Sequence, residues 1–142
     1  MSKSGKILVS ACLLGENCKY NGGNNYSEAV VRFTEGKEVI PVCPERLAGL
    51  GIPRTPIEIR GDRVISRDGE DVTEKLQIAV KEILSQIDGE DIECAVLKSR
   101  SPTCGVRQVY DGSFTGTLTD GSGILARALI DSGLEVIDAE EV

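Results

Sequence analysis

The stretch Lys6-Ile-Leu-Val-Ser-Ala-Cys12 is a nearly continuous apolar run that ends in a cysteine. Runs of this kind are typical of parallel strands that are covered on both faces. Two other stretches have the same character: Glu38-Val-Ile-Pro-Val-Cys43, and Glu93-Cys-Ala-Val-Leu-Lys98 with Cys104 in the turn that follows. Ligands of open α/β sheets bind outside the carboxyl ends of the strands. We therefore expect the three cysteines at these ends to meet at one edge of a parallel sheet.

The segments outside these strands predict the other elements of the fold. They are three helices, a hairpin and a last strand: residues 27–36, 71–88 and 124–132, residues 57–66, and residues 134–137. The second helix is predicted to begin at Asp71 as N-cap, with Glu74 completing a capping box. Residues 105–119 are predicted to be loop or irregular strand. The order of elements predicts an α/β fold of three layers, a mostly parallel sheet with helices on both faces, plus a small β-hairpin insertion.

Size and charge exclude several classes of protein. The chain has 142 residues, a formal net charge of −7 and no histidine. We expect residues 1–142 to form a single domain. Tight nonspecific binding of nucleic acid depends on Lys and Arg, so the acidic balance argues against nucleic acid as a partner of this chain alone. The lack of histidine excludes Ser-His-Asp and Cys-His catalysis.

The location of the protein bears on the chemistry of its thiols. No apolar stretch is long enough to span a bilayer, and no signal peptide precedes the first strand. We therefore expect a cytoplasmic protein with no membrane partner. Thiols stay reduced in the cytoplasm, where sets of cysteines are more often metal-binding or catalytic than disulfide-bonded.

Three of the five cysteines are candidate metal ligands. Three thiolates suit a soft metal or an iron–sulfur cluster, and they leave one coordination position open for a substrate. The spacing of Cys12, Cys43 and Cys104 matches no local metal motif, so this prediction depends on their placement at strand ends. Cys94, at the amino end of its strand, is interpreted as part of the core. Cys18 is interpreted as a non-ligand, because a fourth thiolate would close the open position.

Short motifs are scattered along the chain between residues 7 and 133. They are Ser10-Ala-Cys-Leu-Leu-Gly15, Cys18-Lys-Tyr-Asn-Gly22, Cys43-Pro-Glu45, Pro53-Arg54 with Glu58, Gly69 with Asp71-Val-Thr73, Leu97-Lys-Ser99, Ser101-Pro-Thr-Cys-Gly105 and Tyr110-Asp-Gly-Ser-Phe114. Jointly they resemble the thiouracil desulfidase family, long described as a domain of unknown function. Two positions depart from the family pattern, Asn21 in place of Asp and Thr103 in place of Ser. Both keep a polar side chain, so they affect the expected substrate preference more than the expected cofactor.

The resemblance implies an enzyme with a [4Fe-4S] cluster held by Cys12, Cys43 and Cys104. It also implicates Glu45 and Ser101 in catalysis. The implied reaction is hydrolytic cleavage of the C=S bond of a small thiolated pyrimidine, such as thiouracil, at the open iron, with release of sulfide. A thiocarbonyl sulfur is soft and suits that iron. Glu45 is the carboxylate directly beside a candidate ligand and is our predicted general base, while Ser101 orients the water or the ring.

Two other classes of function stay open at this point. The same three thiolates suit a zinc-binding protein with a structural or hydrolytic role. A cluster-carrying regulator or RNA-binding module is the other class, and the lack of a basic stripe argues against RNA. Individual side chains also have purely structural interpretations: Glu45 as a carboxylate in the first turn of a helix, and Ser101 as the start of a turn.

The remaining polar residues near these motifs carry weaker predictions. Arg54 and Lys98 either bind the charge of the cluster or the substrate, or are simply solvated or paired, and for Lys98 we favour the second interpretation. Tyr20 and Tyr110 either stack on a pyrimidine or pack as ordinary aromatic side chains. The stretch Asp120-Gly-Ser-Gly123 is interpreted as a plain helix start rather than a phosphate site, because it lacks a P-loop lysine.

Overall fold

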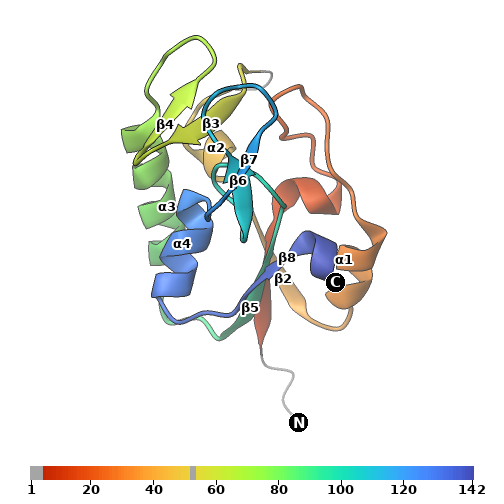
Figure 1. Ribbon diagram of the computed structural model, residues 1–142. Helices are drawn as coiled ribbons and strands as arrows, with labels where there is room; N and C mark the ends of the chain where they lie inside the picture. The colour runs from red at the N-terminus through yellow and green to blue at the C-terminus, as the bar shows by residue number, and fades with distance from the viewer. Residues whose placement is uncertain (1–4, 52–53) are drawn as a thin grey trace.

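The computed structural model describes residues 5–51 and 54–142 (Figure 1). Its elements in chain order are β1 (Lys6–Ser10), the 3-10 turn η1 (Ala11–Leu14), α1 (Glu28–Phe33), β2 (Glu38–Val42), α2 (Pro44–Leu47), β3 (Ile57–Arg60), β4 (Arg63–Ser66), α3 (Thr73–Ile87), β5 (Ile92–Leu97), β6 (Gln108–Tyr110), β7 (Leu118–Asp120), α4 (Ile124–Asp131), β8 (Val136–Asp138) and the 3-10 turn η2 (Ala139–Glu141). Pro53, part of one family motif, lies outside the described residues. Among the described helices, none has both the length and the apolar character needed to cross a membrane.

A parallel sheet with strand order β2-β1-β5-β8 forms the centre of the molecule. β1 lies between β2 and β5, and its last residue, Ser10, is opposite Val42. Because these strands run in the same direction, their carboxyl ends lie at one edge of the sheet. η1, α2 and the turn after β5 all follow directly from that edge.

The two faces of the sheet are covered by different helices. Leu8 of β1 packs with Ile83 of α3 and Leu125 of α4 in one buried cluster. Ile7, the preceding residue, points to the opposite face and packs with Val30 of α1 in another. Figure 1 shows α3 and α4 on one side of the sheet and α1 on the other. The prediction of three layers is therefore confirmed, and it explains why β1 is apolar along nearly its whole length.

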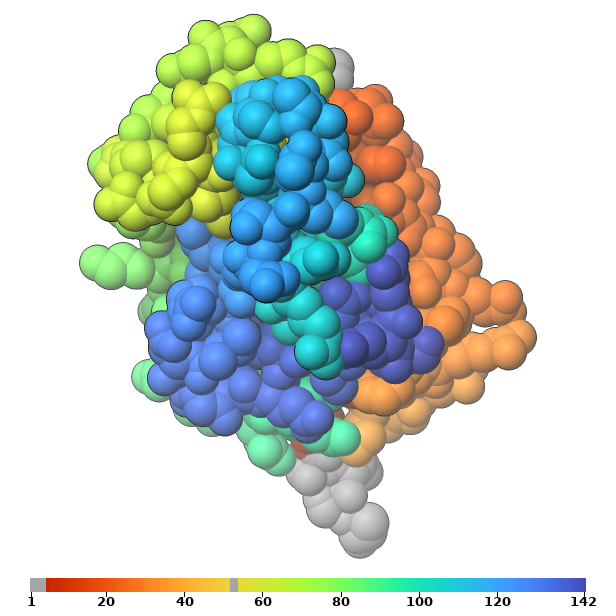
Figure 2. Space-filling view, viewed as in Figure 1, coloured from red at the N-terminus to blue at the C-terminus, as the bar shows by residue number. Residues whose placement is uncertain are grey.

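Two small antiparallel pairs lie outside the main sheet. β3 and β4 form the predicted hairpin. β6 and β7 form a second pair, so the prediction of loop or irregular strand for residues 105–119 missed two short strands. The buried carboxylate of Glu58 joins the two pairs, because it accepts hydrogen bonds from the backbone N–H groups of Gly112 (3.0 Å) and Phe114 (3.1 Å). Figure 2 shows the two pairs side by side on one face.

The predicted strand ends and helix starts need small corrections. β1 ends at Ser10, so Cys12 lies in the η1 turn rather than in the strand. The predicted start of the first helix near Ser27 is confirmed: Ser27 is the N-cap of α1, and its side chain accepts a hydrogen bond from the Val30 N–H group. This helix ends at Phe33 rather than near Gly36.

The start of α3 differs from the prediction for a specific electrostatic reason. Val72 is the N-cap, and Asp71 lies one residue outside the helix. The Asp71 carboxylate accepts a hydrogen bond from the Thr73 N–H group (2.9 Å) and pairs with Arg63 (2.8 Å). These contacts hold the pKa of Asp71 well below its usual range, at about 2. Asp71 thus connects the hairpin to the helix, and the capping box with Glu74 does not form.

Candidate metal centre

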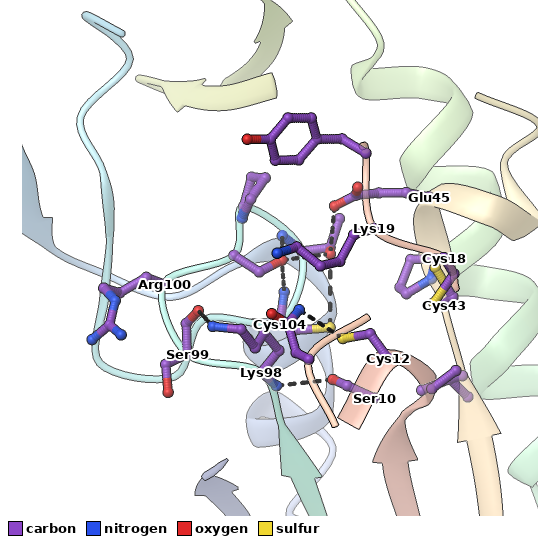
Figure 3. Close-up of a pocket in the computed structure, with 18 of the residues that line it drawn as sticks. Ser10, Cys12, Cys18, Lys19, Cys43, Glu45, Lys98, Ser99, Arg100 and Cys104 are labelled. Atoms are coloured by element: carbon purple, nitrogen blue, oxygen red, sulfur yellow. Dashed lines mark hydrogen bonds between the residues drawn. The ribbon is translucent and has the colours of Figure 1, made fainter. Parts of the chain in front are cut away.

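The predicted site residues come together in one cavity at the carboxyl edge of the sheet. Cys12, Cys43, Cys104, Glu45 and Ser101 all line a cavity of about 330 Å³. Figure 3 shows the cysteine sulfurs directed into this cavity from separate segments of the chain. Cavities of this size are typical of sites for small molecules and cofactors.

Cys12 reaches the cavity because η1 turns the chain sharply at the end of β1. The Asn25 N–H group donates to the Cys12 carbonyl oxygen at 2.9 Å, which attaches the following loop to the turn. The Asn25 side-chain amide also donates to Cys12 Sγ at 3.3 Å. Burial raises the pKa of the Cys12 thiol, while the Asn25 amide lowers it in part. Sequence reasoning did not find Asn25, which lies in a run of polar loop residues without a distinguishing signal.

Cys43 is the residue between β2 and α2. Its backbone is extended, and its carbonyl oxygen accepts a hydrogen bond from the Leu47 N–H group at 2.9 Å, so Cys43 begins the short helix that carries Glu45. The Cys18 thiol lies against that of Cys43 (Figure 3). Burial raises the pKa of Cys18 to about 12, and the adjacent Cys43 thiol adds to the shift. The structure thus brings a fourth cysteine, interpreted from the sequence as a non-ligand, into the same cavity.

Cys104 lies in a tight turn that packs against the start of α4. The N–H groups of Gly123 and Leu125 donate to the carbonyl oxygens of Gly105 (2.7 Å) and Thr103 (2.8 Å). These hydrogen bonds use amides at the start of α4 to hold the cysteine turn, which agrees with the interpretation of Gly123 as a helix start. Burial raises the pKa of the Cys104 thiol to about 12.

Glu45 is held by a buried ion pair. Arg54 Nη2 lies 2.6 Å and Arg54 Nε 3.2 Å from Glu45 Oε1, and the two side chains are 7% and 14% exposed. The guanidinium also donates to the carbonyl oxygens of Cys18 and Gly51, each at 2.9 Å. Glu45 occupies the first turn of α2, as its structural interpretation supposed. Its side chain also lines the cavity. The position of Glu45 therefore agrees both with a first-turn helix carboxylate and with a residue of the site.

Ser101 lies on the turn before Cys104. Its Oγ accepts hydrogen bonds from the N–H groups of Thr103 and Cys104, both at 3.1 Å, which is the turn role that its sequence also allowed. Thr103 Oγ1 lies 3.0 Å from Ser101 Oγ and donates to Glu45 Oε2 at 3.1 Å. The structure therefore joins the two predicted catalytic residues through a side chain that sequence reasoning noted only as a departure from the family pattern.

Cations and aromatic rings complete the walls of the cavity. Lys19, Lys98 and Arg100 line it together with Tyr20 and Tyr110. Lys98 Nζ donates to the carbonyl oxygen of Ser99 at 3.1 Å, so this ammonium is held in place rather than freely solvated. Arg100 is paired with Glu140, so Lys19 and Lys98 supply the positive charge at the wall, and such charge suits an anionic centre.

The donor set fits an iron–sulfur cluster. Thiolates are the usual protein ligands of such clusters, and of the four cysteines that line the cavity the three predicted ligands enter it from three separate segments. Within residues 5–51 and 54–142, no three Cys, Asp or Glu side chains lie close enough to hold a single metal ion. A tetrahedral zinc site with Zn–S bonds of about 2.3 Å would require the sulfurs to converge to about 3.8 Å from one another. A four-iron cluster binds each thiolate through a different iron, so it does not require that convergence.

Changing Arg54 to Lys is expected to destabilise the fold by about 2 kcal/mol, because lysine keeps the charge and loses the planar fork that holds Glu45 and two carbonyl groups. Urea denaturation measures this difference. Arg32→Lys is the matched control, since the Arg32–Glu28 pair is exposed and its loss changes stability by less than about 0.5 kcal/mol. Equal effects of the two variants would contradict a structural role for the buried pair.

Known proteins with similar sequences and structures agree with this geometry. The family described as 2-thiouracil desulfurase matches residues 7–141. The uncharacterized protein YbbK of Bacillus subtilis (strain 168) is 35% identical over 146 residues, covering 96% of this chain and 97% of YbbK. The solved structure of the [4Fe-4S]-dependent thiouracil desulfidase TudS has a TM-score of 0.90 and 32% sequence identity, with 98% of this chain and 93% of that chain covered.

Proposed function

The chain is an enzyme of the 2-thiouracil desulfurase family, and from that premise we propose that it removes sulfur from thiolated pyrimidines such as thiouracil. The proposed reaction is hydrolytic: the oxygen of water replaces the thiocarbonyl sulfur, which leaves as sulfide, and no electrons are transferred. The observation that carries the proposal is one cavity lined by Cys12, Cys43, Cys104, Glu45 and Ser101. TudS, whose name gives this activity and this cofactor, shares the fold over nearly the whole chain.

Cys12, Cys43 and Cys104 are the proposed ligands of a [4Fe-4S] cluster. When bound, such a cluster supplies an iron with a free coordination position, a Lewis acid suited to a soft thiocarbonyl sulfur. The Lys98 ammonium at the cavity wall offsets part of the negative charge of the thiolates, whereas the Arg100 guanidinium is paired with Glu140.

Glu45 is the proposed general base and later acid. Arg54 occupies Oε1 of its carboxylate, so Oε2 is the oxygen that takes a proton from the attacking water. Ser101 orients that water toward the ring carbon. Tyr20 and Tyr110 line the same cavity and provide flat surfaces against which a pyrimidine ring packs.

The proposed cellular location and partners of the enzyme follow from its thiols and its net charge. We propose that the chain works as a single domain in the cytoplasm, where its thiols stay reduced. Its substrate is a small thiolated base, and its net charge of −7 argues against nucleic acid as a partner of the isolated chain.

Sulfide release tests the proposal directly. Anaerobically purified protein with its iron loaded is incubated with 2-thiouracil, and sulfide and uracil are measured together. We expect the two products to form in equal amounts without added reductant. Loaded protein that forms neither product would refute the proposed activity, and a requirement for reductant would refute the hydrolytic mechanism.

The Glu45→Gln variant is expected to lose activity on the order of 100- to 10,000-fold in kcat, because glutamine keeps the size of the side chain but does not accept a proton at neutral pH. Iron content should stay at the wild-type value, since Glu45 is not a proposed ligand. Glu16→Gln is the control, because Glu16 forms an exposed ion pair with Arg46 outside the cavity. A Glu45→Gln variant with wild-type kcat would remove Glu45 from the mechanism.

A further inference from the structure

Lys19 differs from the other cations of the cavity in what its charged group contacts. The cations that line the cavity are Lys19, Arg54, Lys98 and Arg100. The last three are bound to Glu45, to the carbonyl oxygen of Ser99 and to Glu140, respectively. No hydrogen bond or ion pair joins Lys19 Nζ to any residue among 5–51 and 54–142. Figure 3 shows this side chain directed into the cavity, so its three N–H donors are available to a bound molecule.

The backbone on both sides of Lys19 is held by Arg54. The Arg54 guanidinium donates to the carbonyl oxygen of Cys18 at 2.9 Å, and the Arg54 backbone N–H group donates to the carbonyl oxygen of Tyr20 at 2.7 Å. The Lys19 N–H group itself donates to the carbonyl oxygen of Gly23 at 3.0 Å. These hydrogen bonds fix the backbone of Lys19, so its ammonium group approaches the cavity from a defined part of the wall.

A thiouracil ring carries the acceptor that an ammonium group requires. It has two exocyclic atoms, the sulfur to be removed and one oxygen, on ring carbons that are separated by one nitrogen. The oxygen therefore points to the side of the cavity when the sulfur points toward the thiols. An ammonium group only donates hydrogen bonds, and a carbonyl oxygen only accepts them. Lys19 is half-buried, so a hydrogen bond from it to this oxygen is partly shielded from water and strengthened.

The amino counterpart of the same ring does not fit this donor. In 2-thiocytosine an amino group replaces the ring oxygen of 2-thiouracil, and this amino group is a hydrogen-bond donor. Opposite Lys19 it would place donor against donor and leave the ammonium group without a partner inside the cavity. A site that is built to hydrogen-bond one group of a substrate discriminates against an analogue that lacks the group. The cavity wall at Lys19 is thus suited to one of the two ring types.

We propose, on the basis of the function proposed above, that Lys19 is a specificity-determining residue that binds the ring oxygen of the substrate. It thereby selects thiolated pyrimidines that carry an oxygen, the thiouracil class, over those that carry an amino group, the thiocytosine class. Both 2-thiouracil and 4-thiouracil keep an oxygen at their other exocyclic position, so both belong to the selected class. Uracil, the product, keeps the same oxygen and binds to Lys19 without any sulfur.

Two variants test this role: Lys19→Met, which keeps the length and removes the donors, and Lys19→Arg, which keeps them. Wild-type kcat/KM, measured per iron, is expected to be on the order of 10- to 100-fold higher for 2-thiouracil than for 2-thiocytosine. Lys19→Met should lower the value for 2-thiouracil by a similar factor, mainly through KM, and leave that for 2-thiocytosine within about threefold. Lys19→Arg should stay within about threefold of wild type for both. Lys81→Met, at an exposed position of α3 outside the cavity, is the control.

Binding of uracil and cytosine, measured by calorimetry on iron-loaded protein, gives a readout that does not depend on turnover. Wild-type protein is expected to bind uracil on the order of 10-fold more tightly than cytosine, and Lys19→Met should abolish this preference. Equal losses for the two thiolated substrates in Lys19→Met, or wild-type protein without a preference for uracil, would each overturn the role of Lys19. Wild-type protein that prefers uracil but releases no sulfide from thiouracil would instead refute the proposed function, so the two failures are distinct.

Discussion

Iron and acid-labile sulfide are expected to disappear from the protein when Cys12, Cys43 or Cys104 is replaced by serine, and sulfide release from thiouracil should fall to background with them. Wild-type protein purified without oxygen should hold about four of each per chain. The three proposed ligands enter the cavity from separate segments, so the loss of one leaves the cluster with only two of them. Metal and sulfide analysis of the three variants, with kcat measured on 2-thiouracil, checks this result.

Two other cysteines provide controls of different kinds. Cys94 is buried on β5 in the cluster with Ile7 and Val30, away from the cavity, so Cys94→Ala should keep its iron. Cys18 lies against Cys43 inside the cavity, and we expect Cys18→Ala to keep its iron as well, because Cys12, Cys43 and Cys104 are the proposed ligand set. Loss of the cluster in Cys18→Ala would make Cys18 a fourth ligand and contradict an open iron. Iron-free wild-type protein with stoichiometric zinc would favour the zinc-binding alternative.

The sequence predicted the convergence of the cysteines because parallel strands obey a simple rule. Strands that run in one direction present their carboxyl ends at one edge, so residues 12, 43 and 104 meet although they are far apart in the chain. The alternating packing of Ile7 and Leu8 follows from the same geometry, and it predicts helices on both faces. These predictions depend on the periodicity and order of elements, which the sequence displays directly.

The finer arrangement of the site depends on long-range hydrogen bonds that leave no local pattern. Arg54 is nine residues from Glu45 and comes after a loop, and no sequence spacing indicates that its guanidinium binds that carboxylate. Thr103 joins Glu45 across 58 positions of the chain. The same holds for Asp71, which has the residue type of an N-cap but is used by Arg63 from the preceding hairpin. The roles of Arg54, Thr103 and Asp71 thus depend on contacts with residues elsewhere in the fold, which the sequence alone does not indicate.

The turn that carries Cys104 has its own structural requirement, and it lies 19 residues away in the chain at Gly123. A methyl group added at this glycine would lie 2.6 Å from the Thr103 carbonyl oxygen and 2.7 Å from the Cys104 amide nitrogen. All of these are backbone atoms, so no side-chain rotation relieves the overlap. The first turn of α4 and the cysteine turn would have to separate, which would break the hydrogen bonds from Gly123 and Leu125 that join them.

Gly123→Ala is therefore expected to destabilise the fold by about 3–4 kcal/mol, lowering the unfolding temperature by roughly 10 °C, and to reduce the iron content because Cys104 is displaced. Thermal unfolding and iron analysis of the same preparation measure both effects. Gly23→Ala is the control, since a methyl group there meets only the end of the exposed Asn21 side chain, at 3.2 Å. If Gly123→Ala kept full stability and full iron, the cysteine turn would tolerate displacement from α4. The glycine before this helix would then serve as an ordinary helix start, without a role in positioning Cys104, the third proposed ligand.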